Sequence, residues 1–485
     1  MNSWYKNIKH KITIENIMFF GFTFITLSFI IKFNFSEIIL LIIGIFFSIF
    51  TLCFLNNKIL IYFVILLIPF YWVPLYSGRF SILKLITIAA FFMLFTQNLI
   101  TKIKIDRIFI YIFCFIGILY ISAILNDVKG VFQINAISST IMWYIFIPYI
   151  LSEYIKKYNI RQIINIILGL CFIEVILLFF QISFGETFYL QHYFKPEQQE
   201  FLQKNITSLK VGEYYSPFGT FDNRHNLGVF LLFGFAISFS LLFFKNYRTL
   251  LLKVLIGIII LGILFTFSRT SIAGIGLVLI SLFYFIKKYN LTTYRWRRLI
   301  IIIVISMIFL QIIPTLRSAI IERVSPETYG GWRESLEYRD YTILASLKAF
   351  SKNPIIGVGP NNFSLNSHIW LREINAPQII YGKEAHNAYS ELLAELGIIG
   401  GALFFFILSM IIKYLLTAIK IFIKVKDYYM FAISISVISI SILQIFAHLI
   451  GNSVITGFNH FSVPLGFAIG LKSLAQNIDH NLVRQ

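Results

Sequence analysis

The chain has 485 residues, of which 58% are hydrophobic and only 13% are charged. A soluble protein carries about a quarter charged residues and could not bury this much apolar surface, so the composition excludes a soluble globular protein. The formal net charge is +19. The basic residues gather in short segments between apolar blocks, which argues against nucleic-acid binding and points to a membrane protein.

Long apolar blocks recur along the chain. The segments 39–54 and 299–313 contain no charged residue, and with their flanks each approaches the roughly 20 residues that a helix needs to cross a bilayer. We predict an all-α polytopic membrane protein with about 12–14 transmembrane helices and a large external loop that carries short helices. The predicted spans centre near Ile25, Ile45, Leu66, Ala90, Phe115, Met142, Leu170, Phe233, Ile258, Leu277, Ile305, Leu403, Ile435 and Phe467.

Basic residues occur in alternate loops, which is typical of the cytoplasmic loops of membrane proteins. Threading the chain with these loops inside places both termini in the cytoplasm and leaves the long polar segments 183–222 and 316–385 outside. Loops of this length are usually functional or disordered. The basic clusters lie at 102–107, 156–161, 245–248, 287–298 and 413–426.

The threading divides the chain into four predicted parts. Transmembrane helices fill 1–182, and further helices with the first outer loop and an arginine motif fill 183–315. The large external loop occupies 316–388, and C-terminal transmembrane helices occupy 389–485. We expect the functional residues to lie in the external segments.

The first candidate cluster lies at 219–228, where the first outer loop leads into an apolar block. It contains Asn223 and Arg224. A guanidinium is the side chain best shaped to hold phosphate oxygens in bidentate fashion. The alternative for Asn223, or for Asp222 beside it, is that its side chain only caps the following helix.

The second candidate cluster is Thr266-Phe-Ser-Arg269-Thr-Ser271, between two apolar blocks. The threading places Arg269 at the outer surface. A charge held near hydrocarbon is costly, so an anionic partner would explain it. The alternative is an arginine that snorkels to lipid headgroups.

The third candidate cluster runs from His386 to Gly401, where the large loop leads into the next span. A histidine here could act as a general base, because its ordinary pKa lies near physiological pH. Asn387 and Tyr389 are placed to support it, and Gly397 and Gly400 would let a neighbouring helix pack closely. The alternative is a boundary histidine that is hydrogen-bonded to backbone.

The sequence lacks the motifs of metal-dependent sugar transfer, nucleotide binding and zinc binding. There is no Asp-x-Asp pair of a nucleotide-sugar metal site, no Walker A loop and no Cys or His cluster with zinc spacing. We therefore expect no metal and no cofactor, and phosphate chemistry that rests on arginines.

Taken together, the three clusters resemble the O-antigen ligase and polymerase superfamily. The ligase pattern is His, then Asn, Ser or Gln, nine residues, Gly-x-x-Gly, then Gly, Thr or Tyr. His386-Asn387, Gly397 and Gly400-Gly401 match it completely. The Ser-Arg step at 268–269 and the stretch 219–224 are similar to other motifs of the superfamily. So is Pro-x-x-Gly-x-Gly at 354–359, which could also be only a loop turn that holds the histidine in place.

The resemblance implies a helical fold in the bacterial cytoplasmic membrane with the active site facing outside. Members of the superfamily take a glycan from undecaprenyl diphosphate. Ligases pass it to lipid A-core, polymerases pass it to another lipid-linked repeat unit, and some relatives pass it to protein. The expected partners are therefore a lipid-linked glycan donor, a lipid A-core or growing glycan acceptor and membrane lipid, with no nucleic acid.

As a mechanism, His386 would accept the proton of the attacking sugar hydroxyl, while Arg269 and Arg224 would stabilise the diphosphate leaving group. The ligase reaction is the first hypothesis, and a polymerase of O-antigen or capsule is the second. A transporter of lipid-linked glycans is the third. It would place its charges mid-membrane, whereas the charges singled out here lie at the outer boundary.

Overall fold

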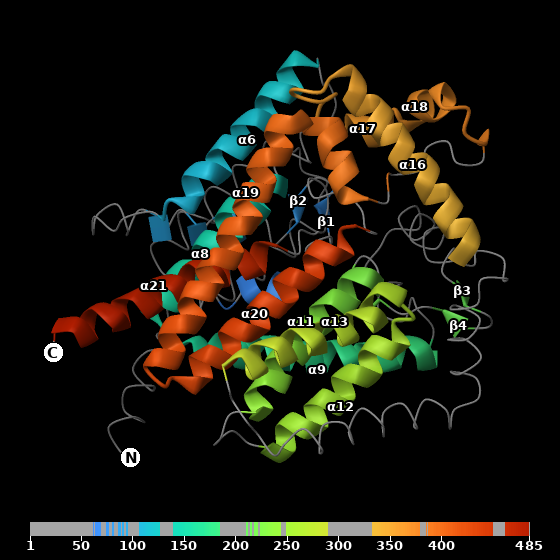
Figure 1. Ribbon diagram of the computed structural model, residues 1–485. Coiled ribbons are helices and arrows are strands. Elements are labelled where there is room, and N and C mark those ends of the chain that lie inside the picture. The colour runs from blue at the N-terminus through green and yellow to red at the C-terminus, as the bar shows by residue number, and fades with distance from the viewer. Residues whose placement is uncertain are drawn as a thin grey trace.

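The structure is a computed structural model. It describes residues 106–126, 139–184, 218–221, 224–243, 249–289, 332–378, 385, 387–449 and 461–484, together with short pieces within 62–95 and at 210–215. These parts are almost entirely helical (Figure 1). Two antiparallel pairs of short strands accompany the helices: β1 (Pro74–Tyr76) with β2 (Phe80–Ser81), and β3 (Lys210–Val211) with β4 (Tyr214–Tyr215).

Within the described residues, six helices are long and apolar enough to cross a membrane. They carry almost no charge in their central turns, because no water is present in hydrocarbon to solvate one. A seventh apolar helix, α12 (Thr249–Phe265), is shorter. The six are α6 (Ile108–Leu125), α9 (Ile160–Phe184), α11 (Arg224–Phe243), α13 (Arg269–Lys288), α19 (Ala388–Lys424) and α20 (Tyr428–Ala447).

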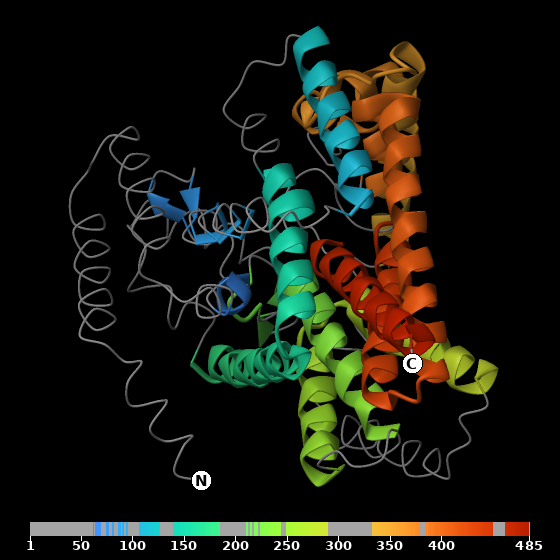
Figure 2. The ribbon, with the colours of Figure 1, turned by 90° about the vertical axis from the view of Figure 1, so that its left-hand side faces the viewer.

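The remaining described helices complete the bundle and the large loop. The π-helix η2 (Met142–Phe146) runs directly into α8 (Ile147–Lys157), which packs against α21 (Ser462–Arg484). The loop segment contains α16 (Trp332–Lys352), α17 (Asn362–Leu365) and α18 (Ser367–Glu373). In Figures 1 and 2, α16–α18 gather at one end of the molecule, around the ends of α6 and α19.

The predicted fold class, an all-α polytopic membrane protein, is confirmed. The predicted spans near Phe115, Leu170, Phe233, Leu277, Leu403 and Ile435 coincide with the six long apolar helices. The predicted spans near Ile25, Ile45 and Ile305 lie outside the described residues.

The long helix α19 is interrupted at Gly397, whose φ of 65° and ψ of −165° are not helical. A normal helix would bond the amides of Ile398 and Ile399 to the carbonyls four residues earlier. Here the two amides donate instead to the carbonyls of Pro354 and Ile355, at N···O distances of 2.8 and 3.4 Å.

The segment 354–359 also donates hydrogen bonds to the two carbonyls of α19 that lose their helical partners at the break. The amides of Val358 and Gly359 donate to the carbonyls of Ala394 and Glu395, at N···O distances of 2.8 and 3.0 Å. Gly357 has a φ of 72°, and a Cβ on it would collide with the α19 backbone at Glu395. The Pro-x-x-Gly-x-Gly stretch is therefore a structural part of the helix that follows the His-Asn step.

This interlock leads to a stability prediction. Gly397→Ala puts a side chain in a backbone region that essentially only glycine adopts, which costs roughly 1–3 kcal/mol, and its Cβ would collide with the Ile355 carbonyl. We expect a clear drop in the thermal unfolding midpoint of the purified protein. Gly169→Ala on α9 is the matched control, since its Cβ meets open space and the change should be neutral or slightly stabilising. An unchanged midpoint for Gly397→Ala would contradict the interlock.

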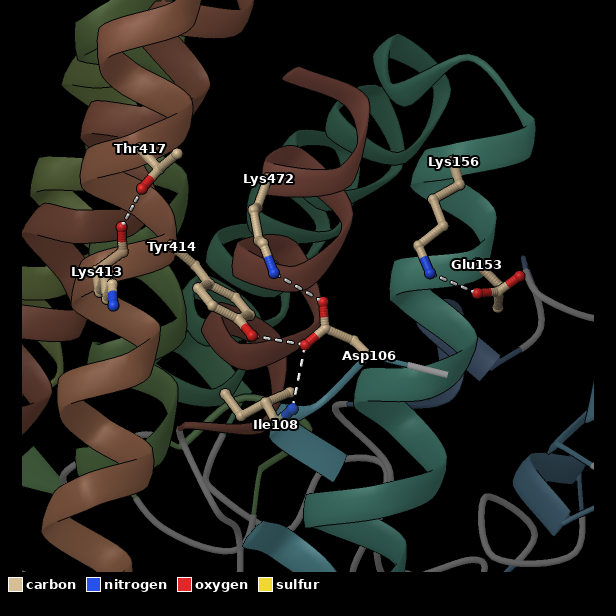
Figure 3. Close-up of polar contacts among 8 residues, drawn as sticks. All are labelled: Asp106, Ile108, Glu153, Lys156, Lys413, Tyr414, Thr417 and Lys472. Atoms are coloured by element: carbon tan, nitrogen blue, oxygen red, sulfur yellow. Dashed lines mark hydrogen bonds and ion pairs between the residues drawn. The ribbon is translucent and has the colours of Figure 1, made fainter. Parts of the chain in front are cut away.

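On the other side of the break, Asp106 joins α19 to α6 and α21 (Figure 3). Asp106 accepts hydrogen bonds from the Tyr414 hydroxyl at 2.6 Å, the Ile108 amide at 3.1 Å and the Lys472 ammonium at 3.0 Å. Burial alone would raise the pKa of Asp106, but these three donors outweigh it and hold the pKa below its usual value. Asp106 is therefore ionised at neutral pH and joins three helices.

Candidate functional site

The first turns of α11 and α13 lie against each other, and each begins with an arginine. Arg224 starts α11 and Arg269 starts α13. Gly228 faces Ser271 so closely that a Cβ on the glycine would collide with the serine side chain. The structure thus places side by side the two helix starts that carry the arginines predicted as phosphate ligands, from segments 45 residues apart.

A tight turn between α12 and α13 orients Arg269. Ser268 caps α13: its Oγ accepts from the Ser271 amide at 3.4 Å and from the Ser271 hydroxyl at 2.9 Å. Phe267 before it has a φ of 49°, a left-handed conformation that a bulky residue rarely adopts. Such strain often gathers at functional sites, and here it directs the chain sharply into the helix that Arg269 opens.

A third arginine, Arg339 on α16, joins the cluster. Its charge lies within electrostatic range of Arg269 and also of His225, the second residue of α11. Burial, and after it the charge of Arg269, lower the pKa of Arg339. All three arginines are half-buried, so their charges are only partly screened by solvent.

Sequence reasoning missed Arg339, because it is one of many charges in the polar loop. A signal was nevertheless present. Thr342, Ala345, Ser346 and Ala349 are buried at helical spacing on α16, a small-residue face typical of a helix that packs on another. Arg339 lies one turn before this face.

The start of α19 lies beside the same helix. The Thr342 hydroxyl donates to the carbonyl of Ala385 at 2.8 Å, and Thr342 is three residues from Arg339, on the same face of α16. Asn387 caps α19 by accepting from the amides of Tyr389 and Ser390 at 3.1 and 3.0 Å. The predicted base His386 lies outside the described residues, as does Asn223.

The end of α20 holds α19 from the other side. The Asn387 side chain donates to the Leu449 carbonyl at 3.2 Å, and the Tyr389 hydroxyl donates to the Ile445 carbonyl at 2.8 Å. The Ala388 amide donates to the His448 carbonyl at 2.9 Å. Asn387 and Tyr389 therefore fix the helix that follows the predicted base.

His448, at the end of α20, is a buried histidine that sequence reasoning missed. Its Nδ1 lies 2.7 Å from the Gln444 carbonyl, and because a carbonyl only accepts, Nδ1 carries the hydrogen. Burial lowers the pKa of His448 to about 4, although this hydrogen bond acts in the opposite direction. The ring is therefore neutral at physiological pH, within electrostatic range of His225.

The glycines of the third cluster serve a different neighbour from the one predicted. Gly397 makes room for the backbone of the 354–359 segment rather than for a second helix, and a Cβ on Gly400 would collide with Leu396 of the preceding turn. Among the residues that the structure describes, no group of three or more His, Cys, Asp or Glu side chains is placed to hold a metal ion.

Apolar helices of membrane-crossing length, with half-buried arginines from three elements at one end, define a polytopic membrane protein with a basic centre. The family model described as O-antigen ligase matches residues 254–405. This match supports membership of the O-antigen ligase superfamily, a group of membrane glycan ligases and polymerases, and it supports an enzymatic role. The match contains Arg269, Arg339 and Gly397. No curated protein matches the chain.

Proposed function

We propose that the protein transfers a glycan from undecaprenyl diphosphate to lipid A-core on the outer face of the bacterial cytoplasmic membrane, as an inverting O-antigen ligase that needs no metal ion. The observation that carries this proposal is the convergence of Arg224, Arg269 and Arg339 beside the start of α19. The family match supports glycan transfer of the ligase or polymerase type.

The arginine cluster suits a diphosphate. Like charges held within electrostatic range raise the free energy of the fold, and a bound anion removes that cost. A diphosphate gains negative charge as the bond to the sugar breaks. Arginines already in place therefore stabilise the transition state more than the ground state, which is what accelerates a reaction.

The proposed base is His386, whose chain neighbours Ala385 and Asn387 are anchored to α16 and α20. The acceptor hydroxyl gives its proton to the imidazole as its oxygen forms a bond to the anomeric carbon. The bond from that carbon to the phosphate oxygen breaks, and undecaprenyl diphosphate leaves with the electron pair. Attack from the side opposite the leaving group inverts the anomeric centre.

Deletion of the gene tests the reaction in the cell. We expect full-length glycan chains on the lipid carrier and none on lipid A-core when the surface polysaccharide is separated on a gel. Single repeat units on the acceptor would identify a polymerase, the second candidate in this family. Unchanged polysaccharide would contradict both.

The absence of a metal requirement is tested with the purified protein, which should keep its transfer activity in excess EDTA. A loss of activity that magnesium or manganese reverses would contradict the metal-independent mechanism.

A further inference from the structure

Two side chains of α9 hold the turn that precedes α11. The Gln181 side-chain oxygen accepts from the amides of Phe218 and Gly219 at 3.1 and 2.9 Å, and its nitrogen donates to the Gly219 carbonyl at 3.0 Å. The Glu174 carboxylate accepts from the Thr220 amide at 2.9 Å and from the Thr220 hydroxyl. Three consecutive backbone amides thus donate hydrogen bonds to side chains of the same helix, α9.

The fit between this turn and α9 is close. Glu174 and Gln181 are seven residues apart, so they lie on the same face of the helix two turns from each other. Gly219 between their contacts has a φ of 60°, and a Cβ on it would collide with the Glu174 carboxylate. Both α9 side chains are almost fully buried. The position of the turn is therefore set by α9.

The turn packs against the helix that Arg224 begins. The amide of Phe221 donates to the Phe218 carbonyl at 3.1 Å, and the Phe221 ring packs on Phe230 of α11 at a centroid distance of 5.2 Å. Further along, Gly234 of α11 lies directly against Cys171 of α9. A shift of the turn on α9 would consequently shift the first turn of α11.

We propose that Glu174 and Gln181 are positioning residues of the donor site, which aim Arg224 at the diphosphate by clamping the turn before it. A carboxylate and an amide buried in an apolar helix are costly, and they persist where they fix a geometry that apolar packing would leave loose. This inference rests on the proposed function, because it assigns the clamp to the diphosphate site.

The test uses the full-length protein in nanodiscs and undecaprenyl diphosphate as the probe. Glu174→Gln keeps the shape but weakens the bonds to Thr220, and we expect it to bind the probe about 10-fold more weakly, which is roughly the effect of losing one hydrogen bond. Thr220→Val removes the hydroxyl from the other side and should act in the same direction, while Thr220→Ser should bind normally. Glu153→Gln is the control, because Glu153 is a buried acid on α8 that pairs with Lys156.

A double variant separates positioning from general stability. If Glu174 acts through Arg224, then Glu174→Gln combined with Arg224→Ala binds no more weakly than Arg224→Ala alone. Additive losses would overturn the inference, and so would normal probe binding by Glu174→Gln and Thr220→Val while Arg224→Ala binds weakly. If Arg224→Ala itself binds the probe normally, the diphosphate role proposed for that arginine fails instead.

Discussion

His386→Ala is expected to lose glycan transfer by about 10²–10⁴-fold, the usual contribution of a positioned general base. The same variant should bind undecaprenyl diphosphate normally, because the base contacts the acceptor hydroxyl and not the leaving group. The chain on both sides of this position is held: Thr342 bonds Ala385, and Asn387 caps α19 while it bonds Leu449. Initial rates with purified protein, and binding of the probe, measure the two effects separately.

His368→Ala provides the matched control, since His368 is an exposed histidine on α18 of the same loop. It should keep normal transfer. Wild-type rates should also rise with pH as the base loses its proton, and the residual activity of His386→Ala should lack that rise. Normal turnover by correctly inserted His386→Ala would remove the base from the mechanism.

Much of the bundle could be predicted because hydrocarbon imposes one strict rule. Backbone polar groups must bond within the helix, so a span reads as an uninterrupted apolar block, as in α6 and α20. The adjacency of the helix starts that carry Arg224 and Arg269 could also be predicted. Each arginine opens such a block, and the threading places both openings at the same side of the membrane.

Features that depend on distant segments could not be predicted. The glycine at 397 was recognised as part of a motif, but the break it allows exists only because 354–359 supplies replacement hydrogen bonds. Glu174 and Gln181 appear in the sequence as isolated polar residues of an apolar helix. Their role emerges only where the turn at 218–220 meets α9.

Arg339 shows the same limit at the site itself. Its partner in space, Arg269, lies 70 residues earlier in the chain. No local pattern specifies that Arg339 of the polar helix α16 will lie within electrostatic range of the start of α13. His448 is a lone histidine after an apolar block, and no local pattern distinguishes it from a packing residue. Tertiary contacts define this half of the site.

Arg269→Ala and Arg339→Ala are both expected to weaken binding of undecaprenyl diphosphate and to lower transfer by about 10²–10³-fold, as removal of one preorganised donor does. Arg269→Lys should restore little, because lysine offers a point charge where arginine offers a planar fork of donors. Arg372→Ala is the control, since Arg372 is an exposed arginine on α18.

The double variant distinguishes a shared anion from two separate roles. Arg269 and Arg339 repel each other when no anion is bound. Removing one of them therefore removes an electrostatic repulsion that acts on the other. The loss in binding for Arg269→Ala with Arg339→Ala should therefore be smaller than the product of the single losses. Binding should also weaken as salt concentration rises in the wild type, and less steeply in each single variant, because screening acts on the charges that remain. Strictly multiplicative losses would indicate two separate roles rather than a shared anion. Normal probe binding by Arg339→Ala would show that Arg339 does not contribute to the diphosphate site.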